Sequence, residues 1–274
     1  MLAYIVFMKK AFGTNVLVTG ASSGIGKSIA ELFAKNGYTV YAISRSIEEC
    51  TIDMGMGRLR QIRCDVTDED SILALRARID KLSIIIHAAG CGIAGSAEDV
   101  DAALARKQLE VNYLGPIAIN HAFLPLLREN ECSLIIFISS IAGRIPIPFQ
   151  SHYSSSKYAL EAYAEALDME ARPFGVRTVL LEPGDTKTGF TSRRQKYIPD
   201  DSPYKAAAEK AISRMERDEM NGKSPETVAR MALKAASRRN PPVRKPIGIM
   251  YSMLMILPRI LPQKLIHRIL MAMY

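Results

Sequence analysis

Tyr153 and Lys157 are the residues whose types and spacing point most directly to chemistry. The small and apolar residues from Tyr158 to Leu167 predict one long helix through the pair, and residues four apart are neighbours on a helical face. A tyrosine hydroxyl normally keeps its proton up to about pH 10, and a nearby ammonium lowers that pKa. The pair is therefore expected to exchange protons near neutral pH, as a general acid or base.

A glycine-rich turn near the start of the chain is the second informative feature. Asn15 to Val18 predict a buried strand that runs into Thr19-Gly20-Ala21-Ser22-Ser23-Gly24-Ile25-Gly26, and Lys27 to Asn36 predict a helix. Glycines at such a junction let the backbone approach a ligand, and the helix N-terminus offers free amides to a pyrophosphate. We predict a dinucleotide-binding turn; the alternative is a glycine-rich turn without a ligand.

Together these motifs resemble the short-chain dehydrogenase/reductase family in its single-domain form, near its hydroxysteroid and retinol dehydrogenase-like members. The family has Thr-Gly-x-x-x-Gly-x-Gly after the first strand, Tyr-x-x-x-Lys, and a serine thirteen residues before the tyrosine. It also has an asparagine in the long middle helix, Asp-Val after the third strand, and Pro-Gly-x-x-x-Thr after the sixth. The matching positions run in order from about residue 13 to residue 190: Thr19 to Gly26, Asp65-Val66, Asn112, Ser140, Tyr153, Lys157, Pro183-Gly184 and Thr188.

One position departs from the family pattern. After the fourth strand the family has Asn-Asn-Ala-Gly or Asn-Ala-Ala-Gly, whereas this chain reads His87-Ala88-Ala89-Gly90. The family asparagine mainly braces the sheet. The departure leaves the predicted chemistry intact and concerns local stability and the seating of the cofactor.

The expected fold is α/β, a doubly wound parallel sheet of the Rossmann type with about seven strands and helices on both faces. A chain of 274 residues, 48% of them hydrophobic, can bury one large core, so residues 1–274 are predicted to form a single domain. Strands are expected near 15–19, 38–43, 60–64, 83–87, 134–138 and 176–182, and helices near 24–36, 68–80, 102–127 and 152–172. Residues 186–222 are expected to form a substrate lid region, and residues 247–274 a basic amphipathic helical extension.

The resemblance implies roles for the site residues. Tyr153 would give or take the proton of the reacting oxygen, Lys157 would lower its pKa and hold the nicotinamide ribose, Ser140 would hydrogen-bond the reacting oxygen, and Asn112 would hold a water that relays protons. The expected cofactor-binding positions are Gly20, Ser22, Ser23, Gly24, Ile25, Gly26, Ser44, Arg45, Asp65, Val66, Ala88, Ala89, Gly90, Tyr153, Lys157, Pro183, Gly184, Thr186 and Thr188.

The end of the second strand favours NADP(H) as the cofactor. An NAD enzyme is expected to place a carboxylate there for the ribose 2′-hydroxyl. This chain has Ser44-Arg45-Ser46 instead, with no carboxylate until Glu48. The forked donors of Arg45 suit a 2′-phosphate; the alternative is a solvated loop arginine.

The predicted function is an NADP(H)-dependent oxidoreductase for a secondary alcohol/ketone or aldehyde, with a lipid-like substrate of the steroid or retinoid type. The alternatives are a 3-oxoacyl thioester reductase or a non-catalytic dinucleotide-binding protein. An epimerase or dehydratase of the extended branch is a further rival, but that branch usually has Gly-x-x-Gly-x-x-Gly and a longer C-terminal domain, neither of which is present here.

Charge is unevenly distributed along the chain. Residues 186–274 carry 18 Lys and Arg against 7 Asp and Glu, and no acidic residue follows Asn240. We expect the basic, methionine-rich tail to cover the substrate pocket or to pack in a homodimer or homotetramer, with peripheral membrane contact as the alternative. Basic residues without interleaved aromatics argue against nucleic acid binding.

The cysteines and the N-terminus bear on location. Cys50, Cys64, Cys91 and Cys132 lack metal-ligand spacing and predict reduced, mostly buried thiols with no metal site. The apolar residues 1–8 precede Lys9-Lys10, the reverse of the order in a signal peptide. We therefore expect a cytoplasmic protein.

Overall fold

The computed structural model describes residues 10–256 and 260–273. The apolar segment 1–8 lies outside the described residues, as do Arg259 and Tyr274 of the predicted C-terminal extension.

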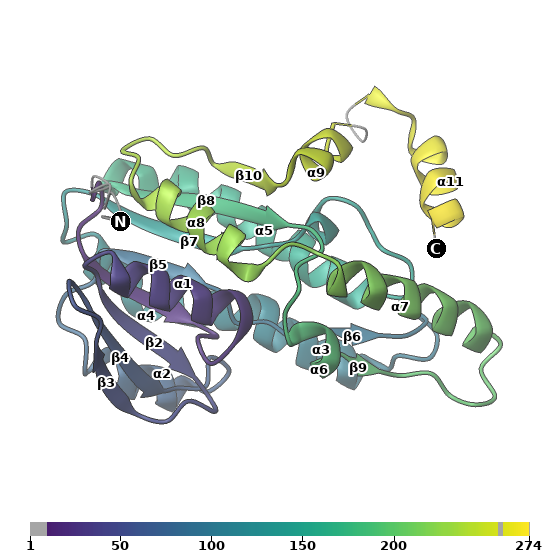
Figure 1. The fold of residues 1–274 in the computed structure, drawn as a ribbon, viewed down its shortest axis with the longest axis horizontal. Coiled ribbons are helices and arrows are strands. Elements are labelled where there is room, and N and C mark those ends of the chain that lie inside the picture. Colours follow the sequence, from purple (N-terminus) through teal and green to yellow (C-terminus); the bar gives the residue numbers. More distant parts are fainter. Residues whose placement is uncertain (1–9, 257–259, 274) are drawn as a thin grey trace, which may run out of the picture.

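An eight-stranded sheet forms the centre of the molecule, in the order β10-β8-β7-β5-β1-β2-β4-β3 (Figure 1). Every neighbouring pair is parallel except β3 with β4. The strands are β1 (Asn15–Thr19), β2 (Thr39–Ser44), β3 (Cys50–Asp53), β4 (Arg58–Arg63), β5 (Ile84–His87), β7 (Ser133–Ile138), β8 (Val176–Pro183) and β10 (Arg244–Ile247). The predicted doubly wound sheet is confirmed, because buried parallel strands appear in the sequence as apolar runs.

Helices cover both faces of this sheet (Figure 1). On one face, α1 (Gly24–Lys35) and α8 (Pro225–Ala236) pack together over a core that includes Val18 and Ile136. On the other face, α2 (Glu69–Arg76), α4 (Gly115–Leu127) and α5 (Ser151–Ala171) pack on a second core that includes Leu17 and Phe137. Alternate residues of the strands therefore serve two cores, as the pleat of a sheet requires.

The long helix predicted over 102–127 is interrupted. It begins as α3 (Ala102–Leu109), passes through a π-helical turn (Glu110–Leu114) and continues as α4. Pro116 has no N–H to donate to the Asn112 carbonyl, and the Gly115 N–H instead bonds the Glu110 carbonyl. The predicted helix over 102–127 is therefore confirmed in its extent, and the π-helical turn inside it was not predicted.

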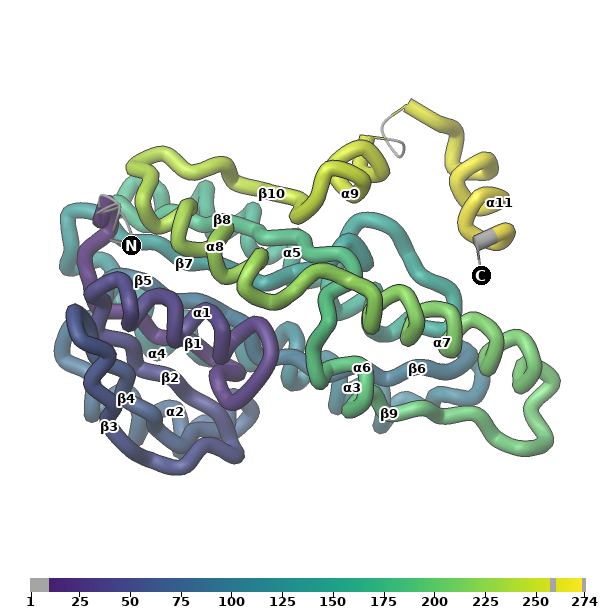
Figure 2. The backbone as a smooth tube through the Cα atoms, viewed as in Figure 1, coloured from purple at the N-terminus to yellow at the C-terminus, as the bar shows by residue number. Residues whose placement is uncertain are grey.

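The chain after β8 builds the region beyond the carboxyl ends of the strands (Figure 2). It forms α6 (Phe190–Arg193), β9 (Gln195–Lys196), which pairs with β6 (Ile93–Ala94), and α7 (Lys205–Met220). The expected lid region 186–222 corresponds to these elements, and closure over a substrate stays a prediction. After β10 come α9 (Ile249–Leu254) and α11 (Gln263–Met273).

Candidate active site

A cavity of about 1300 Å³ lies at the carboxyl ends of the parallel strands. This is where open α/β sheets place their ligands. Of all the residues predicted for catalysis and cofactor binding, only Asn112 is not among those that line it. Positions from residue 20 to residue 188 are therefore brought to one cavity.

In the glycine-rich turn the backbone makes contacts so close that Gly20 and Gly26 leave no room for a side chain. A Cβ on Gly20, where φ is +68°, would lie 2.7 Å from the Ala88 carbonyl oxygen. A Cβ on Gly26 would lie 2.4 Å from the Gly20 carbonyl oxygen. The start of α1 is thus held against the end of β1, with its free amides at the cavity. This cradle fits the pyrophosphate of a dinucleotide.

Polar side chains fasten this turn to its neighbours. The Thr19 hydroxyl accepts hydrogen bonds of 3.0 Å from the amides of both Ala88 and Ala89. Arg193 of α6 donates to the Ser23 hydroxyl over 2.8 Å, although 170 residues separate them in the chain. Sequence reasoning missed Arg193, since no local pattern marks so distant a contact. Its guanidinium supplies a positive charge beside the predicted phosphate cradle.

Arg45 lines the cavity directly after β2. Its Nε is 3.9 Å from an Asp65 carboxylate oxygen, and its side chain is 68% exposed. The guanidinium is therefore accessible at the point where the family places the ribose of the adenosine half. Ser44, next to it, donates a hydrogen bond of 3.0 Å to the Ser22 hydroxyl.

Tyr153 and Ser140 face the same cavity from α5 and from the end of β7. Burial raises the pKa of Tyr153 to about 12, and the Ser140 hydroxyl offsets part of that rise. The Tyr153 ring packs against Phe190 at 5.9 Å between ring centres. At neutral pH the hydroxyl therefore holds its proton, which is the form a general acid needs.

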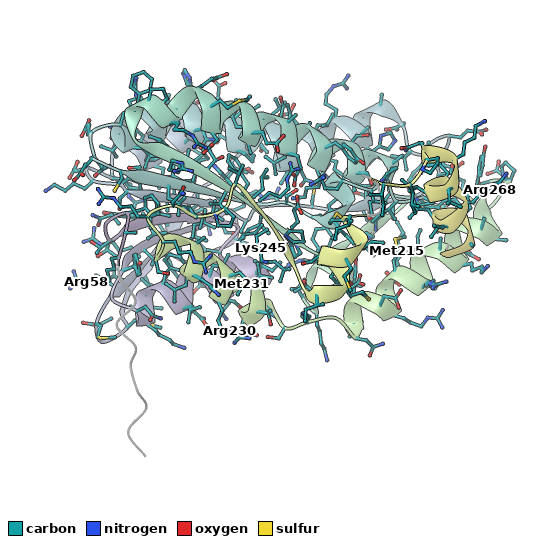
Figure 3. All side chains as sticks on the ribbon, turned by 90° about the horizontal axis from the view of Figure 1, so that it is seen from above. Arg58, Met215, Arg230, Met231, Lys245 and Arg268 are labelled. Atoms are coloured by element: carbon teal, nitrogen blue, oxygen red, sulfur yellow. The ribbon has the colours of Figure 1, made fainter. Side chains whose placement is uncertain are left out.

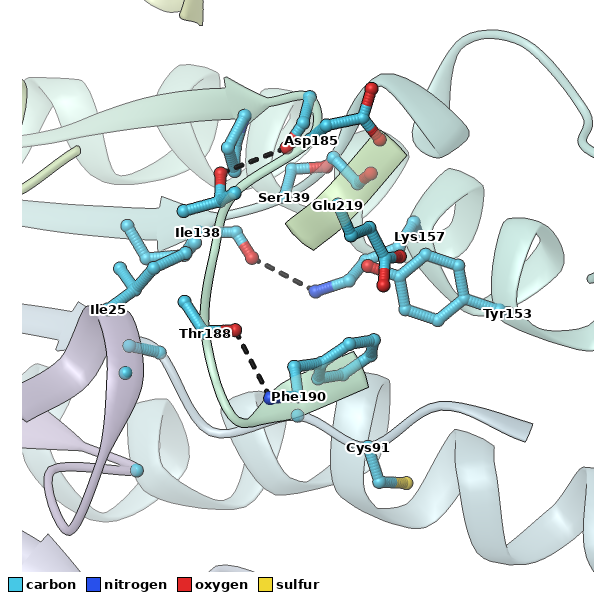
Figure 4. A pocket seen from close by; sticks show the side chains of 18 of the residues that line it. Ile25, Cys91, Ile138, Ser139, Tyr153, Lys157, Asp185, Thr188, Phe190 and Glu219 are labelled. Carbon is cyan, nitrogen blue, oxygen red and sulfur yellow. Dashed lines mark hydrogen bonds between the residues drawn. The ribbon is translucent and has the colours of Figure 1, made fainter. Parts of the chain in front are cut away.

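The Lys157 ammonium reaches the end of β7 (Figure 4). It donates a hydrogen bond of 3.0 Å to the Ile138 carbonyl and lies 5.8 Å from the centre of the Tyr153 ring. Burial lowers the pKa of Lys157 to about 8. Burial therefore determines the net pKa of Tyr153 in this structure, and a lowering of that pKa by Lys157 stays a prediction.

Asn112 is buried behind the cavity wall in the π-helical turn. Its amide group donates to the Cys91 carbonyl over 3.0 Å and to the Ser156 hydroxyl over 3.1 Å, and its oxygen accepts from the Cys91 amide over 2.8 Å. Both side-chain donor hydrogens are thus used. Asn112 connects the loop after β5 to α5, and its role in holding a relay water stays a prediction.

His87, which stands where the family has an asparagine, connects the sheet to the neighbouring helices through contacts of its own. Its Nε2 lies 2.9 Å from the Asn120 amide oxygen, and its ring stacks on Phe137 with the ring centres 4.9 Å apart. Burial lowers the pKa of His87 to about 4, so the ring is neutral at physiological pH. Asn120 in turn donates to the Tyr163 hydroxyl. The residue links β5 to α4 and α5 and does not line the cavity.

The far part of the cavity has an apolar wall that sequence motifs did not mark. It comprises side chains from the loop before α5, from α7 and from the C-terminal helices: Ile141, Ile145, Ile147, Met215, Met250, Met253, Leu254 and Leu270. Asp185 and Glu219 also reach this part, near Tyr153 (Figure 4). Apolar walls with a few polar groups are typical of sites for small organic ligands. Among the described residues, no His, Cys, Asp and Glu gather as a metal site would require.

The cysteine expectation holds only in part. Cys64 is buried, Cys91 and Cys132 are half-buried and Cys50 is exposed, and all are free thiols.

Comparison with known proteins agrees with this geometry. The family model described as short chain dehydrogenase matches residues 14–198. A 3-ketodihydrosphingosine reductase from Bacteroides thetaiotaomicron is 34% identical over 239 residues, covering 85% of this chain and 87% of that protein. A dehydrogenase/reductase SDR family member 7B from Xenopus laevis is 29% identical over 242 residues, covering 82% of this chain and 71% of that protein. The crystal structure of a short-chain dehydrogenase from Streptomyces avermitilis has a TM-score of 0.76 at 27% identity, covering 89% of this chain and 90% of that one.

The motifs, the sheet order and the matched region lead to the same conclusion: this chain belongs to the short-chain dehydrogenase/reductase family of oxidoreductases.

Proposed function

We propose that this protein is an NADP(H)-dependent reductase of a lipid-like ketone or aldehyde, with Tyr153 as its general acid. The observation that carries the proposal is that Tyr153, Ser140, the glycine-rich turn and Arg45 all line one cavity. The relative from Bacteroides thetaiotaomicron is named as a reductase of a keto lipid, which favours the same substrate class.

The cofactor's place follows from the residues that would hold it. The amides of the glycine-rich turn and Arg193 would bind its phosphates, and Arg45 would select the 2′-phosphate. Lys157 would hold the nicotinamide ribose. When bound, NADP(H) supplies the hydride for the carbonyl carbon.

In this reaction the protein itself would supply the proton that the reduced carbonyl oxygen takes up. Ser140 would hydrogen-bond the carbonyl oxygen, and Tyr153 would transfer its hydroxyl proton to the alkoxide that develops there. The pKa of Tyr153, raised by burial to about 12, keeps this proton in place at neutral pH, which is the form that reduction requires. General acid assistance of this type is worth about 10²–10⁴-fold in rate.

Two measurements test the proposal. Fluorescence titration should give tighter binding of NADPH than of NADH, and NADPH oxidation should be detected on a panel of steroid, retinoid and long-chain ketones. Turnover confined to 3-oxoacyl thioesters would favour the alternative reductase. Cofactor binding with no turnover on either panel would favour a non-catalytic dinucleotide-binding protein.

A further inference from the structure

The C-terminal helices expose an unusual amount of apolar surface. Ile249, Met250 and Met253 of α9 are 81%, 66% and 65% exposed. Leu265, Ile269 and Met271 of α11 are exposed as well. Monomeric proteins seldom leave large apolar patches open to water unless a partner or a membrane covers them.

The helix α11 has an inner and an outer face. Ile266 and Leu270 are buried against Ile145 and Met255, which fixes the helix on the body of the protein. Leu265 and Ile269 lie one residue earlier on the helix and remain exposed. The exposed apolar row is therefore not what holds the helix in place.

Basic side chains run beside that apolar row. Lys264 and Arg268 are four residues apart, directly before Leu265 and Ile269, and all four are exposed. Neither Lys264 nor Arg268 makes an ion pair with the described residues. Lys245 adds an exposed charge on β10. Figure 3 shows Lys245 on β10 and Arg268 on α11. No acidic residue follows Asn240.

These charges and apolar side chains distinguish between two possible partners of the surface, a second copy of the chain and a lipid membrane. A second copy meeting the same face would bring cations against cations, with no carboxylate from the segment to pair them. An anionic lipid surface supplies both the negative charge and the apolar layer. Among residues 10–256 and 260–273, no helix is long and apolar enough to cross a bilayer, so the contact would lie in the plane of the membrane.

The same face borders the candidate active site. Met250 and Met253 are both exposed and among the residues that line the cavity, so they form its rim. Leu254 and Leu270 continue the apolar lining inward. An apolar substrate would thus move from a lipid layer to the cavity along apolar side chains, without crossing water.

We propose that α9 and α11 form a docking surface for an anionic lipid membrane, and that the apolar substrate enters the cavity through this face. The docking surface stands on its own observations, and the entry route rests on the proposed lipid-like substrate.

Sedimentation of the full-length protein with phosphatidylcholine vesicles, with and without phosphatidylserine, tests the docking surface. The protein should bind only the anionic vesicles. Each charge at such a surface is worth about five-fold in affinity, so Lys264→Gln with Arg268→Gln should weaken binding about 25-fold. The matched control is Lys35→Gln with Lys81→Gln, which removes the same charge from exposed positions at the end of α1 and before β5. The control should bind as the parent does.

Three results would overturn the docking surface. One is the absence of vesicle binding, and another is an equal loss of binding in both double variants. The third is a dimer, seen by analytical ultracentrifugation, that dissociates in Leu265→Ser with Ile269→Ser while vesicle binding persists. That result would assign the face to a second copy.

Kinetics separate this inference from the proposed function. With NADPH, the Lys264/Arg268 variant should keep parental rates on a small water-soluble ketone and lose rate on an apolar ketone delivered in anionic vesicles. Parental rates on both substrates would overturn the entry route and leave the reductase proposal standing. No turnover of any carbonyl by the parent would refute the reductase proposal, while vesicle binding would still be measurable.

Discussion

The Tyr251 hydroxyl donates a hydrogen bond to the Asp185 carboxylate and accepts one of 3.1 Å from the Asp185 amide. The Tyr251 ring also occupies the space above Gly184, where an added Cβ would lie 2.2 Å from the ring. Besides the contact with the cofactor that we propose for it, the Pro-Gly motif at the end of β8 therefore makes room for Tyr251 of α9. The contacts of Tyr251 with Gly184 and Asp185 fix α9, and with it the C-terminal segment, at the cavity.

The first prediction concerns the hydrogen bonds between Tyr251 and Asp185. Tyr251→Phe should lower the free energy of unfolding by about 1–3 kcal/mol, because the Asp185 amide and carboxylate each lose a partner in a partly buried place. Urea denaturation followed by circular dichroism measures the change. Tyr158→Phe is the control, since the Tyr158 side chain is 42% exposed on α5. Equal free energies of unfolding for the two variants would show that the Tyr251 hydroxyl does not stabilise the fold.

The second prediction concerns the proton donor. Tyr153→Phe should abolish carbonyl reduction and leave NADPH affinity nearly unchanged, because the ring and its packing on Phe190 survive while the hydroxyl is lost. Single-turnover kinetics and fluorescence titration measure the two effects. A rate within a factor of about ten of the parent would remove Tyr153 from the role of general acid.

The sequence allowed the parallel sheet and most of the cavity to be predicted because both leave local signals. Buried strands such as β7 are continuous apolar runs, and the glycine-rich turn is a contiguous motif. The antiparallel β3 was missed because all of its residues are exposed and no hydrophobic pattern marks it. Contacts such as Arg193–Ser23 and Tyr251–Asp185 join residues 170 and 66 positions apart, so only the folded chain reveals them. The burial that raises the pKa of Tyr153 has the same origin.

The third prediction concerns cofactor choice. Arg45→Ala should weaken NADPH binding far more than NADH binding, because a charge-assisted hydrogen bond to the 2′-phosphate is worth about 1.5–3 kcal/mol. Fluorescence titration of both cofactors measures the difference. Arg60→Ala is a suitable control, since Arg60 is in β4 and does not line the cavity. A parent protein that prefers NADH would show that the end of β2 does not select the cofactor as proposed.

The fourth prediction is a pH dependence of stability. Burial raises the pKa of Glu161 to about 7, and the nearby Glu182 carboxylate adds to the rise, while Arg244 and Arg144 oppose it. Between about pH 4.5 and pH 7 the unfolded chain has released this proton while the folded chain keeps it. The free energy of unfolding should therefore fall as pH rises through this window, by up to about 1.4 kcal/mol per pH unit from this group.

Glu161→Gln should remove that part of the slope, because glutamine mimics the protonated acid. Arg244 keeps partners in this variant, with Glu165 at 2.8 Å and Glu182 at 2.9 Å. Urea denaturation at several pH values from 5 to 8 compares the parent with Glu161→Gln and with Glu165→Gln, whose carboxylate is 48% exposed. A parental slope in Glu161→Gln, or an equal loss of slope in Glu165→Gln, would contradict the assignment of the slope to Glu161.

The last prediction concerns the C-terminal segment as a wall of the substrate cavity. Removal of the residues after Pro246 should impair activity on bulky apolar substrates more than on small carbonyls. Truncation would also remove Ile247 and Tyr251, which are buried in the folded protein, so a point substitution is the sharper test. Met253 of α9 lines the cavity and is 65% exposed, so we expect a bulky ligand that extends to the rim to contact it and a small ketone not to.

Met253→Ala should therefore raise KM for a bulky apolar ketone about five-fold, corresponding to about 1 kcal/mol of lost apolar contact, with little change for a small ketone. Met220→Ala is the matched control, because Met220 is 51% exposed at the end of α7 and does not line the cavity. Steady-state kinetics with saturating NADPH, in detergent-free buffer without vesicles, keeps membrane contact out of the comparison. If the ratio of kcat/KM for the two ketones stays the same in Met253→Ala, the C-terminal segment is not a wall for the bulky substrate, and its contact with the membrane must be judged from vesicle binding alone.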